Sequence, residues 1–309
     1  MRGGLLAVLL LGAATSCTLT ETALVPETDA LVVEASFLWS ETRPNRVVVW
    51  AHRSLGPSSG APVEARVELS LPAPGAGGTL VLPAAETSDC VTDRPPEIGG
   101  RCYALEGGVL DDVLPGDRMG LVVTTPEGDR LEGATRLPGS FSLLTAEDGG
   151  RCGLPPDTPL EIRWTRAEGA SAYLNETLFR GLPEAFAPRG IAVEEDPLAL
   201  LGLSLSASDT TIVFPGEFGI FDRGDLEQDL AVALQSGLPP SSRADVLISA
   251  ADQNLVNWLR GGGFNPSGEI RLPSLSGDGT GFFGALVLRG FEVVVGDPPP
   301  DGMPACIDG

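Results

Sequence analysis

The single histidine of this 309-residue chain, His52, is the first residue to consider for chemistry. A Ser-His-Asp triad would have to use it as the base. The chain has no G-x-S-x-G segment to present the serine, and one histidine excludes an H-E-x-x-H zinc helix. Because His52 ends the strand-like run 46–52, we interpret it as a strand-end residue and predict no catalytic residues.

Two groups of adjacent carboxylates are the other candidates for acid–base chemistry: Glu194-Glu195-Asp196 and Asp111-Asp112. A glycosidase needs two carboxyl groups about 5–10 Å apart across the sugar. Such pairs arise by chance among 42 acidic residues, and neither group is flanked by the aromatic residues of a sugar platform. We interpret both groups as solvated surface. A secreted hydrolase of the glycosidase type, with an unidentified carboxylate pair, is the alternative function.

Residues with metal-binding chemistry are sparse. The chain has no C-x-x-C segment and one histidine, so zinc is a poor rival explanation for its cysteines. The loop 276–279 offers oxygen ligands to calcium but lacks the alternating acids and final glutamate of an EF-hand loop. We therefore predict no metal and no cofactor, and leave calcium binding by this loop open.

The first of the five cysteines closes the opening stretch MRGGLLAVLLLGAATSC. Arg2, a short apolar run and small residues form the pattern of a secretory signal. The apolar run 5–12 is about half of the roughly 20 residues that a spanning helix needs. Small residues directly before Cys17 resemble a bacterial lipobox, so we predict a signal peptide over 1–16 and a lipid anchor on Cys17. A cleaved signal with an incidental cysteine is the alternative.

Beyond the signal, residues 17–29 are polar, contain Pro26 and show no apolar period, which predicts a tether. No later segment reaches about 18 apolar residues, so we expect the membrane contact to be made through acyl chains on Cys17. The formal net charge of −22 repels phosphate backbones and excludes nucleic acid as a partner.

Four cysteines remain after the anchor: Cys90, Cys102, Cys152 and Cys306. An even number in an exported chain predicts disulfides, for which three connectivities are possible. We favour Cys90–Cys102, which closes a loop rich in proline and glycine, and Cys152–Cys306, which ties the second half of the chain to its last residues. The chain-entropy model assigns them about 3 and about 5 kcal/mol.

These residues must be positioned by strands more than by helices. The 40 glycines and 27 prolines favour many short strands. In the first half, strand-like segments separated by turn residues occur at 31–39, 46–51, 63–69, 79–83, 102–105, 118–125 and 130–137. Their number and spacing predict an immunoglobulin-like β-sandwich over 30–146, with a domain boundary at 147–150.

The second half, 150–309, is predicted to be a β-rich domain. Leu160, Ile162 and Trp164 alternate and Tyr173 lies on the next expected strand, which resembles the opening of a fibronectin type III domain. Two amphipathic segments predict helices near 225–236 and 250–260. Strands are expected after them at 269–272, 282–289 and 291–295.

The second helix carries its own start signal. Ser249 and Asp252 stand at the spacing of a capping box, and Gly261 is expected to be the C-cap. Its apolar stripe predicts a helix that closes one end of a sandwich.

The order of the pieces LVVEASFLW, LVVTTPEGDRLEGATRLPG and GDGTGFFGALVLRGFEVVV resembles a family of uncharacterised bacterial outer-membrane lipoproteins, with a domain of unknown function found beside TonB-dependent receptors. The resemblance implies a non-catalytic binding or structural module at the membrane surface of a Gram-negative-type bacterium, accessory to an outer-membrane transport system. The implied partner is an envelope protein such as a TonB-dependent receptor, and a polysaccharide is the other expected partner. The family brings no catalytic residues to this chain.

Overall fold

The computed structural model describes part of the chain, namely residues 29–54, 62–72, 78–90, 99–217, 227–261, 271–296 and 302–306. The predicted signal peptide, Cys17 and nearly all of the predicted tether lie outside the described residues. The described residues form mainly strands with a few short helices, which confirms the predicted mainly β fold.

The largest sheet, here called sheet A, has nine strands in the order β12-β11-β14-β16-β1-β2-β6-β5, with β9 also paired to β16. Its strands are β1 (Leu31–Ser40), β2 (Arg46–Arg53), β5 (Ala84–Ala85), β6 (Gly100–Glu106), β9 (Arg151–Leu154), β11 (Ala172–Arg180), β12 (Leu198–Leu203), β14 (Arg243–Ala251) and β16 (Gly279–Val295). Sheet A therefore combines strands from both halves of the chain.

Two smaller sheets and several helices complete the described structure. Sheet B has the order β15-β8-β7-β3-β4, with β3 (Arg66–Ser70), β4 (Thr79–Val81), β7 (Arg118–Thr124), β8 (Arg130–Arg136) and β15 (Leu275–Gly277). A two-stranded sheet pairs β10 (Leu160–Arg163) with β13 (Thr211–Phe214). The helices are α1 (Thr87–Cys90), α2 (Leu182–Phe186), α3 (Gln228–Leu234) and α4 (Gln253–Arg260), with two 3₁₀ turns, η1 (Gly108–Asp112) and η2 (Ala187–Arg189).

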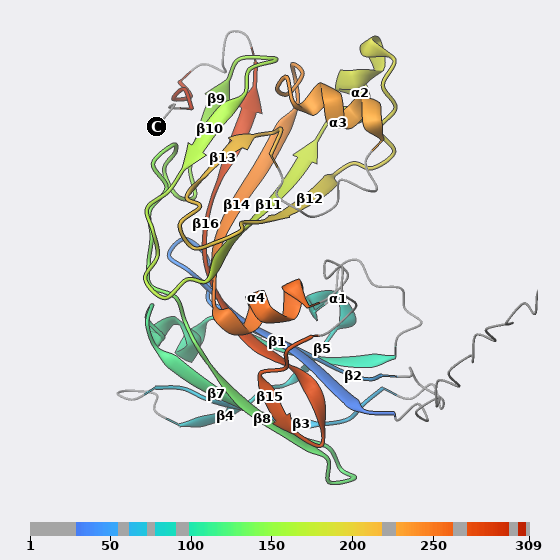
Figure 1. Cartoon of the computed structure of the whole chain (residues 1–309), viewed down its shortest axis with the longest axis vertical. Helices are drawn as coiled ribbons and strands as arrows, with labels where there is room; N and C mark the ends of the chain where they lie inside the picture. Colours follow the sequence, from blue (N-terminus) through green and yellow to red (C-terminus); the bar gives the residue numbers. More distant parts are fainter. Residues whose placement is uncertain are drawn as a thin grey trace, which may run out of the picture.

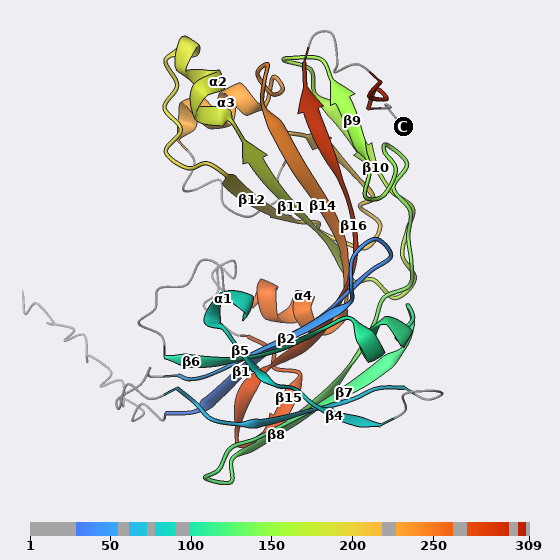
Figure 2. The same cartoon turned by 180° about the vertical axis from the view of Figure 1, so that it is seen from behind.

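Strand β16 is the longest strand and runs from the strands around β1 to those around β14 in Figures 1 and 2. Its first part pairs in parallel with β1, from Gly279 opposite Leu31 to Leu288 opposite Ser40. Its second part pairs antiparallel with β14. Strand pairing thus crosses the boundary predicted at 147–150, and β15 and β16 belong to the same two sheets as β1 to β8.

The main core lies on one face of sheet A. Alternate residues of β1, such as Ala35, Phe37 and Trp39, are buried on this face, as the two-residue period of a strand requires. A second and smaller cluster lies under α4, where Leu255, Trp258, Phe282 and Leu286 are buried together. Figure 1 shows α4 between the strands around β1 and those around β11.

Helix α4 begins later than predicted. Its N-cap is Asp252, whose carboxylate accepts a hydrogen bond from the backbone N–H of Leu255 (3.0 Å). Ser249 lies within β14, so the prediction that it caps the helix is wrong. The reason is that β14 stays paired to β11 and β16 through Ala251, and these ladder bonds hold Ser249 in an extended backbone.

The described turns of α3 fall inside the predicted helix 225–236, and residues 218–226 lie outside the described part of the chain. Leu230 and Leu234, two of the residues expected on its apolar face, are buried in the main core. Within the described residues, none of the helices combines the length and apolar composition needed to cross a bilayer.

Two disulfides join the four remaining cysteines in the pairs that the sequence favoured. Cys90–Cys102 links α1 to β6, with a Cα–Cα distance of 5.7 Å. Cys152–Cys306 links β9 to the last described segment, with a Cα–Cα distance of 4.8 Å. The second bridge closes a loop of 154 residues in sequence separation, against 12 for the first.

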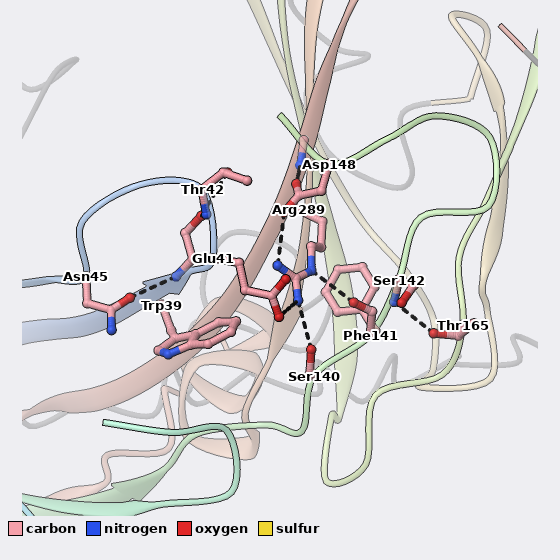
Figure 3. A network of polar contacts seen from close by, with 12 residues as sticks. Trp39, Glu41, Thr42, Asn45, Ser140, Phe141, Ser142, Asp148, Thr165 and Arg289 are labelled. Carbon is pink, nitrogen blue, oxygen red and sulfur yellow. Dashed lines mark hydrogen bonds and ion pairs between the residues drawn. The ribbon is translucent and has the colours of Figure 1, made fainter. Parts of the chain in front are cut away.

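Arg289 of β16 is a buried cation, with 4% of its side chain exposed. Figure 3 shows its guanidinium surrounded by partners from two segments. It pairs with Asp148 (2.9 Å) and with Glu41 (2.7 Å). It also donates hydrogen bonds to the carbonyl of Phe141 (2.9 Å) and the hydroxyl of Ser140 (2.8 Å). These contacts fasten the β1–β2 turn and the segment 140–148 to β16.

The same cluster is closed by an aromatic ring and by backbone contacts. The Arg289 guanidinium lies 5.4 Å from the centre of the Trp39 ring, within cation–π range. The other carboxylate oxygen of Asp148 accepts a hydrogen bond from the N–H of Gly290 (2.8 Å). The segment 147–150, predicted from the sequence to be a domain boundary, is therefore held against β16.

We expect Arg289→Met to destabilise the fold by about 3 kcal/mol or more, because removing one partner of a buried pair leaves the other charge uncompensated. Urea unfolding followed by tryptophan fluorescence measures the loss. The control is Arg66→Met on β3, whose pair with Glu68 is 62% exposed on the arginine side and should be worth about 1 kcal/mol or less. Equal losses in the two variants would contradict the role given to Arg289.

The two disulfides are expected to differ in their contribution to stability. Replacing Cys152 and Cys306 by serine should lower the free energy of unfolding by about 5 kcal/mol, against about 3 kcal/mol for the Cys90–Cys102 pair, because the longer loop restricts the unfolded chain more. Denaturant unfolding of the two double variants makes the comparison. Non-reducing peptide mapping of the exported protein checks the pairing itself, and four free thiols would refute it.

Candidate functional site

A cavity of about 590 Å³ opens where the end of sheet B meets the start of α4. Strands β7 and β8 contribute Arg118, Thr135 and Arg136 to its lining. The loop before β11 contributes Glu168, and the start of α4 contributes Asp252 together with the next two residues. The cavity thus gathers charged side chains from segments more than a hundred residues apart.

The residues at the start of α4 hydrogen-bond to the part of β16 that lies beyond the end of β14. After β14 ends, the Asp252 N–H donates to the carbonyl of Ala285 (3.1 Å). The side-chain amide of Asn254 then donates to the carbonyls of Ala134 on β8 (2.9 Å) and Phe283 on β16 (2.8 Å). These bonds join sheet A to sheet B and form one wall of the cavity.

The helix comes close because position 284 is a glycine. A Cβ atom there would lie 2.7 Å from the Cβ of Leu255 and 3.2 Å from a carboxylate oxygen of Asp252. Gly139 has the same role on the opposite wall, where its N–H donates to the carbonyl of Glu168 (2.7 Å). A Cβ at position 139 would lie 3.1 Å from the Glu168 backbone nitrogen.

Asp252 is the buried acid of the cavity, with 5% of the residue exposed. One of its oxygens accepts from the Thr135 hydroxyl (2.6 Å), and the other accepts from the Leu255 N–H (3.0 Å). Burial raises the pKa of its carboxyl group, and the hydrogen bonds from Thr135 and from the backbone oppose this rise. Both oxygens therefore serve the junction between α4 and β8.

Arg118 and Arg136 form the cationic side of the cavity. They are directly opposite each other in the antiparallel pair β7–β8, and both are exposed. In the described part of the chain neither side chain forms an ion pair or a hydrogen bond. Most of the other described arginines do have a carboxylate partner, as Arg130 and Arg151 do. This pair thus belongs to a minority of the described arginines, and it places two such cations side by side.

A second cavity of about 400 Å³ lies on the outer face of sheet A and differs in its charges. Two of its carboxylates, Asp245 and Glu292, are paired with Arg180 and Arg151. Its charges are thus largely compensated within the protein, which makes the first cavity the stronger candidate for a site.

The structure does not bring the sequence-predicted candidates together. His52 lies at the end of β2, and its ring N–H donates to the carbonyl of Arg53 (3.0 Å). Asp111 accepts from the N–H of Asn45 (2.9 Å), and Asp196 accepts from the N–H of Gly181 (3.2 Å). None of these acids or His52 lines the 590 Å³ cavity.

The acidic residue of the loop considered for calcium binding already has a partner within the protein. Asp278 accepts a hydrogen bond from the Arg130 N–H (3.1 Å). Among the residues that the structure describes, no group of three or more histidine, cysteine, aspartate or glutamate side chains is placed to hold a metal ion. The lipid anchor predicted at Cys17 falls outside the described ranges.

Sequence reasoning singled out Asp252, as the second member of a capping box with Ser249, but missed the rest of the site. Arg118 and Arg136 stand in ordinary strands, and Glu168 stands in a turn. The arginine pair could have been found from the hairpin turn at Pro126–Asp129. Counting outward from this turn along β7 and β8 places residues 118 and 136 opposite each other.

The sequence matches no known protein-family model and no curated protein sequence. The resemblance to outer-membrane lipoproteins therefore stays a prediction.

We expect Asp252→Ala to lower the free energy of unfolding by about 2 kcal/mol, since it removes a helix N-cap and leaves the buried Thr135 hydroxyl without its acceptor. Asp252→Asn keeps a capping oxygen and should lose far less. Thermal unfolding at neutral pH compares the two variants. Equal losses would show that the cap is not what Asp252 contributes.

The same acid should make stability depend on pH. The folded-state pKa of Asp252 is raised above its ordinary value of 3.8, so the folded protein holds this proton more tightly than the unfolded chain. The resulting stabilisation is fully present below pH 3.8 and is lost as the pH rises through the folded-state pKa. The stability of Asp252→Asn relative to the parent protein should therefore increase over that range, and urea unfolding at several pH values measures it.

Proposed function

We propose that this protein is a non-catalytic binding module of the cell envelope, held at the membrane by acyl chains on Cys17. The observation that carries the proposal is the distribution of charge in the 590 Å³ cavity. Its buried acid, Asp252, has both oxygens engaged in joining α4 to β8. Its cations, Arg118 and Arg136, have no described partner and are available to a ligand. Such a site is suited to binding an anionic ligand and poorly suited to acid–base catalysis.

The envelope location rests on the opening stretch of the sequence and on the two disulfides. Disulfides persist in oxidising compartments outside the cytoplasm. The lipobox-like residues before Cys17 and the resemblance to outer-membrane lipoproteins favour the outer membrane of a Gram-negative-type bacterium. The partner is then an envelope protein such as a TonB-dependent receptor, or a polysaccharide, and the acidic chain is unsuited to nucleic acid.

We assign the first sandwich to the immunoglobulin-like architecture, with β15 and β16 added to its sheets. The support is two facing antiparallel-rich sheets over a shared core. For a fibronectin type III-like second part, the support is the contact of Trp164 with Tyr173, whose ring centres lie 5.3 Å apart at a steep angle. Tyr173 also accepts a hydrogen bond from the Ala167 N–H through its hydroxyl (2.7 Å).

One observation favours the alternative, a hydrolase of the glycosidase type. Glu168 lines the same cavity as Asp252, so two carboxyl groups from different segments face one space. A retaining or inverting glycosidase would use one as the acid and the other as the nucleophile or base. The engagement of both Asp252 oxygens argues against this use.

The proposal is tested in two steps. In cells, Cys17→Ser should move the protein from the membrane fraction to the soluble fraction, because without acyl chains nothing else is proposed to hold it there. Mass spectrometry of the mature N-terminus should find an acylated cysteine, and a free thiol at Cys17 would refute the anchor. The matched control is Ser16→Ala, which keeps a small residue before the cysteine.

In the second step, the purified protein is incubated with labelled cell-wall and capsular glycans. We expect no turnover, and the same result for Glu168→Gln. Hydrolysis that is lost in Glu168→Gln or Asp252→Asn, while the variants stay folded, would establish the hydrolase instead.

A further inference from the structure

We propose that Arg118 and Arg136 recognise the carboxylate of an acidic saccharide in the cavity between β7, β8 and the start of α4. The inference rests on the proposed binding function and names the class of ligand. It begins from a feature that the fold alone does not explain, the pairing of two cations across a strand ladder.

Residues directly opposite in an antiparallel pair have Cβ atoms about 5 Å apart, and like charges at this distance destabilise the sheet. Most of the other described arginines have a carboxylate partner, and acids outnumber bases 42 to 20 in the chain. On the same two strands, Arg130 is paired with Glu132. Leaving the cavity pair uncompensated thus costs stability, which a bound anion would restore.

The geometry of the pair suits a carboxylate. Each guanidinium presents several N–H donors in a planar fork that matches the two oxygens of a carboxylate. Two such forks on neighbouring strands can converge on one anionic group at the cavity wall. Both side chains are exposed to the cavity, so their binding to a ligand requires no rearrangement of the sheet.

The rest of the lining points to a saccharide. A volume of about 590 Å³ is that of a small-molecule site, whereas a protein partner would bury a broad surface. Its walls include Gly116, Gly139 and Gly169 beside polar side chains. Glu168 lines the cavity and is exposed, so its carboxylate can accept hydrogen bonds from hydroxyl groups. A ligand rich in hydroxyls fits this surface better than an apolar one.

The charges also limit the anion to a weakly charged one. Glu168 shares the cavity with the two arginines, and its carboxylate repels a second negative charge on the ligand. A uronic acid carries one carboxylate among hydroxyls and satisfies this limit. A phosphate group, with a charge between one and two at neutral pH, satisfies it less well.

The test is calorimetry on the full chain carrying Cys17→Ser, which leaves every described residue unchanged. The probes are D-galacturonate and D-glucuronate, with D-galactose as the neutral counterpart and inorganic phosphate as a second anion. We expect a uronate to bind and galactose to bind at least about tenfold more weakly, the effect of losing one charge-assisted contact. Arg118→Gln and Arg136→Gln should each weaken uronate binding by at least about tenfold, and the lysine variants should weaken it less, because lysine keeps the charge and loses the fork.

The matched control is Arg166→Gln. Arg166 is exposed and has no described partner, but it does not line the cavity, so this variant removes the same long-range charge without the contact. Its uronate affinity should fall far less than that of either cavity variant, because its guanidinium does not line the cavity and exposed charges are screened by salt. Circular dichroism and thermal unfolding check that each variant is folded.

Absence of binding by either uronate, equal binding of galactose, tighter binding of phosphate, or full affinity in the folded double variant Arg118→Gln/Arg136→Gln would each overturn the inference. These outcomes leave the envelope anchor and the absence of hydrolysis untouched, because those are measured by fractionation and by glycan turnover.

Discussion

The guanidinium of Arg289 lies at the point where the parts of the molecule meet, and it satisfies charges and carbonyls from separate segments. A buried cation is tolerated only when its hydrogen-bonding groups are all engaged. The segments that carry its partners must therefore all be in place in the folded protein. The β1–β2 turn supplies Glu41 and the segment after β8 supplies Ser140 and Asp148. This requirement fixes the path of the chain between its two halves and holds β16 as a strand shared by both.

The shared strand in turn creates the cavity. Since β16 pairs with β14 along only part of its length, the end of β14 exposes an edge that must be covered. The cap residues of α4 cover it through bonds from Asn254 and Asp252 to β8 and β16. The cavity lies beside these cap residues, so its shape depends on how sheet A and sheet B meet. The same arrangement buries the carboxyl group of Asp252.

The charge pattern gives the site its chemical character. The protein as a whole is strongly acidic, with a formal net charge of −22. Within that background, the cross-strand arginine pair is a local positive patch enclosed by a polar wall. In the second cavity, by contrast, Asp245 and Glu292 have arginine partners.

The sequence by itself determined the local features, namely the alternating strands and the apolar face of α3, because period and turn residues act over short stretches. The even number of cysteines predicted two disulfides and the sequence favoured one of three connectivities, which the structure then showed. Only the tertiary structure decided that β16 completes the sheet begun by β1, that Ser249 belongs to a strand, and that Arg118, Arg136, Glu168 and Asp252 share one cavity. These depend on which distant strands pair and in which register. That choice is made by the packing of whole faces and by buried charges such as Arg289, which no short stretch of sequence contains.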